Sequence, residues 1–383
     1  MPQSPESPDS SPSRDSPPKK RWGNRPWKID FQPAPRAIPE AVDFAIVGGG
    51  FSGLAAAAWL RRTEPGKSVA LFEAETLGAG SSGQTGGIAL GETAAGDLPG
   101  LGDVLAGYQQ ILRELGVDGD LALPGAWELA HNRKRLPNSP IAWKDSGELC
   151  AVAEVRGGSV NPGKVVGGLA RAADRLGAML FENSRVEDIA FEGPLRLEAG
   201  GKQVRAQRVL VATNAQSLEL NGLAGRAEPK FTLALATEPL STEQIEELGL
   251  ASGKSFYTLD LPYLWGRLLG PGQIIFGSGL VHLNDWRELA TLDVSSGEAA
   301  ELFARLERRV HGLHPALGSV KFTHRWGGPI LVAEEWQPVF AAHPRSPSAI
   351  VLGAFSGHGV ALSVYLGRWA AEAMLGRRKL PEW

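Results

Sequence analysis

The sequence is short of several features that would point to particular classes of protein. A single cysteine, Cys150, stands among 383 residues, which excludes an internal disulfide and a metal site built from several cysteines. The net charge is only −3, so nothing indicates a nucleic-acid partner. No apolar run reaches the roughly 18 to 20 residues of a membrane-spanning helix, and the first thirty residues lack the apolar core of a secretory signal. We therefore expect a cytoplasmic protein with no metal site and no membrane span.

The amino terminus is instead rich in proline. Residues 1–39 hold ten of the 27 prolines and few apolar side chains, so burial cannot offset the entropy that is lost on ordering. We predict a disordered or extended tail over 1–39, disordered to about residue 20. Four large apolar side chains would let its later part lie extended against the globular body: Trp22, Trp27, Ile29 and Phe31.

The folded part begins with the pattern of a β-α-β unit. An apolar run at 43–47 predicts a buried strand, an alanine-rich stretch at 52–62 predicts a helix, and 68–73 predicts a second strand. The turn after the first strand fits G-x-G-x-x-G, which allows a tight turn, a close pyrophosphate and helix–strand packing. At the end of the second strand, Glu73 is placed to accept hydrogen bonds from a ribose. In this unit, the residues predicted to contact a dinucleotide are Gly48, Gly50, Phe51, Ser52, Gly53, Glu73 and Ala74.

The same motif binds NAD or FAD, and a second glycine-rich segment bears on the choice. Residues 80–87 read Gly-Ser-Ser-Gly-Gln-Thr-Gly-Gly, and they would wrap backbone amides around a second part of an extended dinucleotide. With this segment the chain resembles the D-amino-acid-oxidase-type FAD-dependent oxidoreductases, the family of glycine oxidase, monomeric sarcosine oxidase and γ-glutamylputrescine oxidase. Gln84 and Thr85 stand where Arg and Asn are common in that family, which removes a charge and keeps polar donors.

Further motifs follow in the family's order between about residues 42 and 375. They are the helix start Asn161-Pro162, Val186, the strand end Thr213-Asn214 and the segment 351–360. The resemblance implies noncovalent FAD, since Cys150 lies far from the carboxy-terminal position that serves for covalent attachment in the family. It extends the predicted cofactor contacts to Ser81, Ser82, Gln84, Thr85, Gly86, Gly87, Val186, Thr213, Asn214, Gly353, Ser356, Gly357, His358, Gly359 and Val360.

The turn Ser356-Gly357-His358-Gly359 leads into the last predicted helix, at 360–375. Its backbone N–H groups and the positive end of that helix would face the pyrimidine ring of the flavin, which carries negative charge when it is reduced. His358 is a candidate catalytic base. The competing interpretation is a turn residue whose ring lies beside the flavin.

The resemblance also implies oxidation of a C–N bond, with a hydride passing to flavin N5 and an imine as product. Three family residues are missing. Ala361 stands where sarcosine oxidases carry a lysine for the substrate carboxylate, 326–331 lacks the arginine of glycine oxidases, and 273–276 lacks the lysine that activates oxygen. We therefore favour an amine over a simple amino acid, and the electron acceptor stays open between oxygen and another carrier.

The substrate side is predicted to use aromatic residues that contact a cationic amine and an arginine that holds an anionic end. The candidates are Tyr257, Tyr263, Trp265, Arg267 and Trp326, of which Tyr263, Arg267 and Trp326 join His358 as predicted catalytic residues. Two other functions stay open: an NAD(P)-linked dehydrogenase that uses the same glycine loop, and a non-catalytic FAD-binding interaction module. The sequence does not indicate an oligomeric state.

The predicted fold class is α/β, a Rossmann-type FAD-binding domain with a second, largely antiparallel α+β substrate domain inserted. Strands around 231–238, 255–259 and 273–279 and a charged helix near 297–310 carry the prediction for the second domain. Ahead of the second domain's strands, we predict two separate strands at 203–206 and 208–213. The FAD-binding domain is placed at 40–90, 155–220 and 320–383, and the substrate domain at 91–154 and 221–319.

Overall fold

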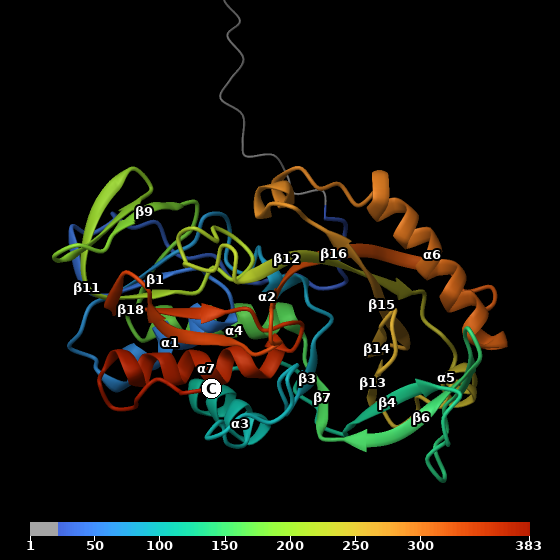
Figure 1. Ribbon diagram of the computed structural model, residues 1–383. Helices are drawn as coiled ribbons and strands as arrows, with labels where there is room; N and C mark the ends of the chain where they lie inside the picture. Colours follow the sequence, from blue (N-terminus) through green and yellow to red (C-terminus); the bar gives the residue numbers. More distant parts are fainter. Residues whose placement is uncertain (1–21) are drawn as a thin grey trace, which may run out of the picture.

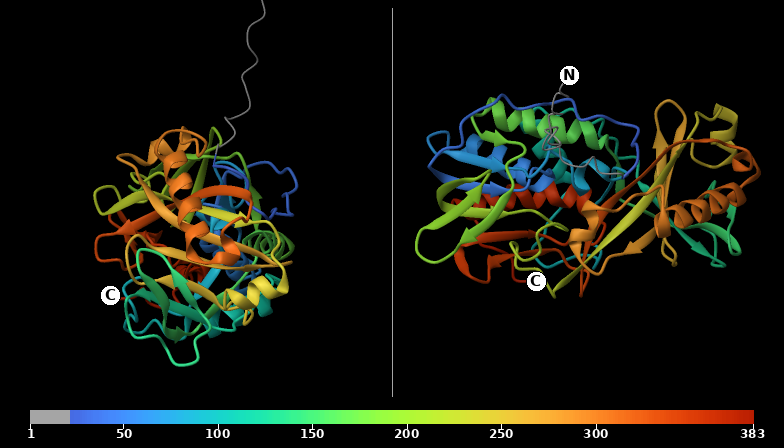
Figure 2. Two further views of the ribbon diagram at one scale, coloured as in Figure 1. Left: turned by 90° about the vertical axis from the view of Figure 1, so that its right-hand side faces the viewer. Right: turned by 90° about the horizontal axis from the view of Figure 1, so that it is seen from above.

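The structure is a computed structural model, and it describes residues 22–383. The predicted disorder up to about residue 20 falls outside these residues. The chain forms two lobes, each built on its own sheet, and they lie side by side in Figures 1 and 2. The predicted mixed α/β fold is confirmed.

The first lobe contains a mostly parallel sheet with the order β17-β18-β11-β1-β2-β8. At its centre, β1 (Ala41–Val47) pairs in parallel with β2 (Val69–Phe72), and α1 (Phe51–Thr63) connects them. These two strands are largely buried, as continuous apolar runs predict for a sheet covered on both faces. The remaining strands of this order are β8 (Met179–Phe181), β11 (Lys202–Val211), β18 (Ser346–Gly353) and the antiparallel edge strand β17 (Val339–His343).

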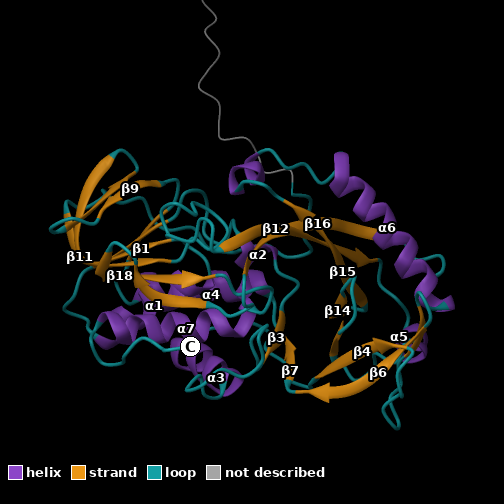
Figure 3. Cartoon of the chain, viewed as in Figure 1, coloured by secondary structure: helices purple, strands orange, loops and turns teal. Residues whose placement is uncertain are grey.

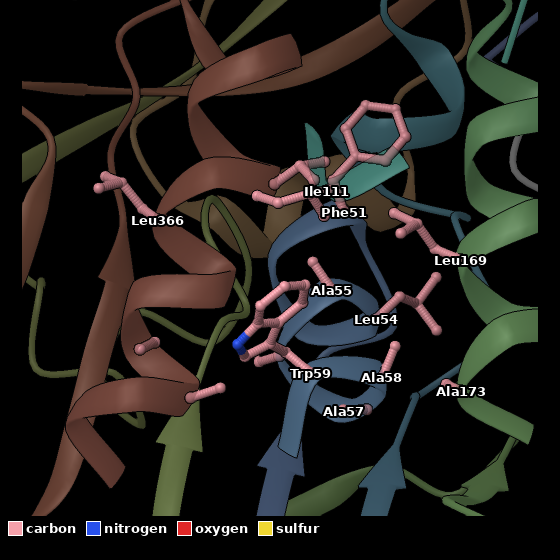
Figure 4. Packing of buried hydrophobic residues seen from close by; sticks show 14 of the residues in the cluster. Phe51, Leu54, Ala55, Ala57, Ala58, Trp59, Ile111, Leu169, Ala173 and Leu366 are labelled. Atoms are coloured by element: carbon pink, nitrogen blue, oxygen red, sulfur yellow. The ribbon is translucent and has the colours of Figure 1, made fainter. Parts of the chain in front are cut away.

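Helices cover one face of this sheet (Figure 3). In Figure 4, α1 lies between α4, which contributes Leu169 and Ala173, and α7, which contributes Leu366. A Cβ on Gly367 of α7 would lie 2.5 Å from the Ser52 carbonyl oxygen, so glycine allows the two helices to approach closely. The bounds of the three helices that pack here with α1 are Val104–Leu115 for α3, Pro162–Arg175 for α4 and Gly359–Met374 for α7.

The other face of the first sheet is covered by a β-ribbon. It consists of β9 (Val186–Ala190) and β10 (Leu195–Ala199), and β10 pairs antiparallel with β11. The two strands predicted at 203–206 and 208–213 are wrong as separate elements, because β11 runs unbroken. Its first half pairs with β10 and its second half with β18, while β1 pairs with most of its length on the other side, so no turn interrupts the strand.

The second lobe contains a largely antiparallel sheet with the order β16-β12-β15-β14-β13-β4-β6-β5. One pair in it, β13 with β4, is parallel. Helices α5 (Thr242–Glu247) and α6 (Gly297–Leu313) and the 3₁₀ turns at Trp286–Ala290 and Pro315–Leu317 accompany it. The strands are β4 (Ala126–His131), β5 (Ala142–Lys144), β6 (Glu148–Val155), β12 (Ala227–Thr237), β13 (Ser255–Thr258), β14 (Leu264–Leu269), β15 (Gln273–His282) and β16 (Phe322–Ala333).

Two predicted domain boundaries differ from the architecture. β16 belongs to the second sheet, where it pairs with β12, although the range 320–383 had been placed with FAD binding. α3 packs in the hydrophobic core of the first lobe, although 91–154 had been placed with the substrate domain. β3 (Ile88–Leu90) and β7 (Gly157–Ser159) pair antiparallel where the chain passes between the lobes. Both differences arise from long-range contacts, namely the strand pairing of β16 and the core packing of α3, and such contacts leave no local signal in the sequence.

Over residues 22–383, no helix is long and apolar enough to cross a membrane. Within the same residues, no group of three or more His, Cys, Asp or Glu side chains is arranged to hold a metal ion.

Candidate active site

A cavity of about 900 Å³ lies where the two lobes meet. From the first lobe it is lined by the turn Gly48–Ser52, the segment around α2 (Ser81–Gln84) and the turn before α7. From the second lobe it is lined by the inner face of the sheet. On β12, Phe231 and Leu235 pack into the outer core while Thr232 and Ala234 line the cavity, as strand alternation requires.

The glycine turn has the shape that a pyrophosphate needs. Gly48 adopts φ +110°, which favours glycine, and a Cβ on Gly53 would lie 2.0 Å from the Gly48 carbonyl oxygen. Gly50 is the N-cap of α1 and provides no side-chain cap, so the amino end of the helix opens to the cavity. Ser82 Oγ accepts a hydrogen bond from the Phe51 N–H at 2.9 Å and joins the second glycine-rich segment to this turn.

Glu73 fixes the other side of the turn. Its Oε2 accepts from the Gly49 N–H at 2.8 Å and its Oε1 accepts from the Glu75 N–H at 2.9 Å. The carboxylate lines the cavity together with Ala74 and Val186. Each carboxylate oxygen has a second lone pair, so contact with a ribose is compatible with these bonds, and the ribose role stays a prediction.

The segment 81–87 is tied firmly to the second sheet. Ser81 Oγ donates to the Pro329 carbonyl at 2.7 Å, and Trp326 Nε1 donates to the Gln84 carbonyl at 2.9 Å. Trp265 packs so closely that a Cβ on Gly86 would lie 2.2 Å from its ring. The segment is therefore held between the lobes by contacts with the strands that line the cavity.

The end of β11 is linked to the turn before α7. Asn214 Oδ1 accepts from the Ala354 N–H at 2.9 Å, and Asn214 Nδ2 donates to Ser81 Oγ at 3.2 Å. A Cβ on Gly353 would lie 3.3 Å from Asn214 Cα, so glycine makes room for this link. Thr213 Oγ1 accepts from Asn221 Nδ2 at 3.1 Å.

His358 stands at the start of α7 and faces the cavity. It is the N-cap residue, without a side-chain cap, and follows Ser356 and Gly357, which both have positive φ. Its Nδ1 lies 3.4 Å from the Ser356 carbonyl oxygen. Burial lowers the pKa of His358, and the Ser356 contact and the charge of Glu92 oppose this only in part. The imidazole is therefore neutral at neutral pH.

Most of the predicted site residues meet at this cavity. Among the described residues, four of them do not line it: Gly53, Gly87, Gly353 and Arg267. The three glycines support its walls through close backbone packing. The predicted residues that do line it are Gly48, Gly50, Phe51, Ser52, Glu73, Ala74, Ser81, Ser82, Gln84, Thr85, Gly86, Val186, Thr213, Asn214, Tyr257, Tyr263, Trp265, Trp326, Ser356, Gly357, His358, Gly359 and Val360.

Arg267 corrects one prediction. The guanidinium was expected to hold an anionic end of the substrate, but it is 4% exposed and donates to three main-chain carbonyls. Nε bonds to Gly86 at 2.6 Å, Nη2 to Val160 at 2.9 Å and Nη1 to Leu268 at 3.2 Å. Burial lowers its pKa to about 10. Arg267 thus holds the segment 81–87 in place through the Gly86 carbonyl, and it does not face the substrate space.

A group that sequence reasoning missed is a pair of glutamates around Tyr257. The Tyr257 hydroxyl lies 3.1 Å from Glu92 Oε1 and 2.9 Å from Glu128 Oε1, and all three residues line the cavity. Burial, together with the two carboxylates, raises the pKa of Tyr257 far above its usual range. One local signal was available, because Glu128 interrupts the apolar stretch 126–130 of β4.

Comparison with known proteins identifies the class. Residues 43–373 match the family described as FAD dependent oxidoreductase, so the chain belongs to that family. It is 26% identical over 392 residues to a probable oxidoreductase, OrdL, of Haemophilus influenzae, which covers 91% of this chain and 86% of that protein. It is also 26% identical over 380 residues to γ-glutamylputrescine oxidoreductase of Escherichia coli, which covers 87% of this chain and 84% of that protein.

Solved structures share the fold. Glycine oxidase from Geobacillus kaustophilus aligns with a TM-score of 0.71 and 21% identity, covering 89% of this chain and 96% of that one. L-proline dehydrogenase from P. horikoshii aligns with a TM-score of 0.70 and 18% identity, covering 90% and 96%. Family membership decides between the two cofactors that the glycine motif left open: this is an FAD-dependent oxidoreductase.

The residues fit this cofactor. The cavity is continuous from the open amino end of α1, past Glu73, to the open amino end of α7. An extended dinucleotide needs such length, with N–H groups for its phosphates at one end and donors for the flavin at the other. Gly48–Ser52, Glu73 and Ser82 would hold the adenosine and pyrophosphate part of FAD. Gln84–Gly86 and Ser356–Val360 would hold its flavin ring.

Proposed function

We propose that this protein oxidises the C–N bond of a cationic amine, with FAD bound noncovalently. When bound, the flavin supplies the acceptor, at N5, for a hydride from the carbon next to nitrogen. The bound ammonium group first releases a proton to solvent, which frees the nitrogen lone pair. The C–H bond then breaks as the hydride leaves, the lone pair forms the C=N bond of an iminium ion, and loss of a second proton to solvent gives the imine. The observation that supports an amine as the substrate is the Glu92–Tyr257–Glu128 group in the cavity.

The electrostatics of the cavity favour an amine over a simple α-amino acid. Two carboxylates within hydrogen-bond reach of one hydroxyl attract an ammonium group and repel a carboxylate. A tyrosyl hydroxyl has one hydrogen, so it can donate to only one of the two glutamates at a time. The other oxygen atoms stay available as acceptors. The arginine predicted for a carboxylate, Arg267, bonds to main-chain carbonyls instead.

The aromatic residues of the second lobe would orient the substrate. Tyr263 and Trp265 line the same cavity, and their ring faces can contact a cation or its alkyl chain. The side chain of Trp326, by contrast, is 0% exposed and packs against Trp27, so it supports the wall of the cavity and does not face the substrate space. Orientation is the main requirement for hydride transfer, because a neutral amine drives imine formation with its own lone pair. The open amino end of α7 would stabilise negative charge on the reduced cofactor. The electron acceptor is open between oxygen and another carrier.

The direct test is an anaerobic screen for flavin bleaching. The purified protein is mixed with mono- and diamines and, as a matched set, with α-amino acids of the same chain length. We expect bleaching by amines and none by the amino acids. Bleaching by amino acids alone would overturn the proposal, and bleaching by neither set would refute amine oxidation by this cavity.

The noncovalent state of the cofactor is tested separately. We expect acid precipitation to release all the yellow colour into the supernatant, since Cys150 is buried in the second lobe between β5 and β4. Cys150 also does not line the cavity. Colour that stays in the pellet would contradict noncovalent binding.

His358→Asn tests whether His358 is a base or a flavin neighbour. We expect the reductive rate to fall about 10–100-fold, at or below the low end of the loss typical of a positioned acid–base group. The flavin potential should shift, and the pH profile should keep an inflection set by the substrate amine, because the His358 imidazole is already neutral. Stopped-flow reduction over a range of pH measures both. An inflection that vanishes while flavin content and substrate affinity hold would identify His358 as the base.

A further inference from the structure

A segment ahead of the family match spans both lobes. Residues 22–31, called the strap below, precede the matched range 43–373. Two tryptophans of the strap are buried, Trp22 at 1% and Trp27 at 6% exposure. Trp22 packs in the core of the second lobe, while Ile29 and Phe31 pack against the core of the first. The strap therefore contacts both walls of the cavity.

The first part of the strap is fastened to β16 around Trp326. The Gly327 N–H donates to the Trp22 carbonyl at 2.9 Å, and the Asn24 N–H donates to the Arg325 carbonyl at 2.9 Å. Gly23 pairs with Trp326 as an isolated bridge, and a Cβ on Gly23 would lie 2.0 Å from the Arg325 carbonyl oxygen. The strap thus runs directly over the backbone of a residue that lines the cavity.

Trp27 then reaches the segment 81–87. Its Nε1 donates to the Gly83 carbonyl at 2.8 Å, and its ring meets the Trp326 ring edge-on, at 5.5 Å between centroids and 84° between planes. Trp326 Nε1 in turn donates to the Gln84 carbonyl at 2.9 Å. Two indoles in mutual contact therefore hold two consecutive carbonyls of α2.

Ile29 completes the support. Its Cδ1 is so close that a Cβ on Gly78 would lie 2.8 Å from it, and a Cβ on Gly83 would lie 3.2 Å from it. Below this contact, α2 presents Ser81, Ser82 and Gln84 to the cavity. The strap thus covers α2 from the side opposite to the predicted cofactor.

From these contacts we infer that Trp27 is a positioning residue that preorganises the segment 81–87 and Trp326 for the flavin. A loop that is already ordered loses less entropy when its ligand binds, so the ligand binds more tightly. Trp27 does not line the cavity, and it acts through the Gly83 carbonyl and the Trp326 ring. The inference rests on FAD dependence, which family membership shows, and is independent of the proposed substrate.

The test is Trp27→Phe in the full chain, studied as the holoprotein. The change keeps an aromatic ring and removes the hydrogen bond to Gly83, so we expect FAD to dissociate about tenfold faster after dilution. The visible absorption bands of the bound flavin should shift, and hydrogen exchange of residues 81–87 should accelerate. Trp22→Phe is the matched control, because Trp22 Nε1 donates to the Leu289 carbonyl at 3.1 Å, outside the cavity. It should lower the melting temperature and leave FAD dissociation and the spectrum unchanged.

Ile29→Val provides a second variant if Trp27→Phe yields no folded holoprotein. It deletes the Cδ1 atom that contacts the glycines and should speed FAD dissociation about two- to threefold. Unchanged dissociation, spectrum and exchange in Trp27→Phe would overturn the inference. Equal changes in Trp22→Phe would also overturn it, because they would show a general loss of stability. These measurements do not depend on the substrate. They would therefore still test the role of Trp27 if the proposed amine substrate were wrong.

Discussion

Gly50→Val is expected to abolish FAD binding while the chain still folds. A Cβ on Gly50 would lie 2.8 Å from Ser82 Oγ, the atom that accepts the Phe51 N–H. The added methyl groups would fill the space in which a pyrophosphate approaches the amino end of α1. Gly50 has φ −87°, so the effect would come from lost space and not from backbone strain. The flavin-to-protein absorbance ratio of the purified variant measures it, and circular dichroism confirms the fold.

The matched control is Gly66→Val, in the exposed turn between α1 and β2. A Cβ there meets nothing within 4 Å, so the same substitution should leave flavin content unchanged. If Gly50→Val copurified with a full complement of flavin, the phosphates would have to lie elsewhere.

The β-α-β unit could be predicted from the sequence because its signals are local. An apolar run, a glycine turn and an alanine-rich helix each specify their own structure, and residues close in sequence form the contacts. The start of α4 is equally local, since Asn161 Oδ1 accepts from the Lys164 N–H as an N-cap does. The motifs around 81–87 and 356–360 have local signals of the same kind, and both line the cavity together with the glycine turn.

The acidic group of the cavity could not be predicted, because it is made by long-range pairing. Tyr257 and Glu128 face each other since β13 and β4 pair in parallel, with Tyr257 in register with Glu128. Their segments are 129 residues apart, and Glu92 comes from a loop outside the named strands. Arg267 shows the converse error. The sequence predicts that this cation binds substrate, whereas in the structure three main-chain carbonyls from different segments accept its hydrogen bonds, and a sequence does not reveal such partners.

The double change Glu92→Gln with Glu128→Gln is expected to reduce kcat/KM for a cationic amine by about 100–1000-fold. Glutamine has nearly the size of glutamate and still accepts a hydrogen bond from Tyr257, so the shape of the cavity is kept while two negative charges are lost. Hydrogen bonds to charged groups contribute more than neutral ones, and two such contacts account for a loss of this size. Flavin content should stay at the wild-type level, because both carboxylates lie beside Tyr257, among the residues that we predict for the substrate side. Steady-state and anaerobic reduction kinetics measure the change.

The matched control is Glu154→Gln on β6, a strand that pairs with β4. Glu154 forms an ion pair with Lys254 and does not line the cavity, so its loss removes a charge from the same sheet without touching the substrate space. We expect less than a twofold effect there. The decisive comparison is between an amine and an analogue of the same length that carries a carboxylate. In the double variant the amine should lose most of its advantage over the analogue, because repulsion of the anion disappears with attraction of the cation. An equal loss of kcat/KM for both compounds would show that the glutamates serve the structure of the cavity, and the cationic substrate would have to be abandoned.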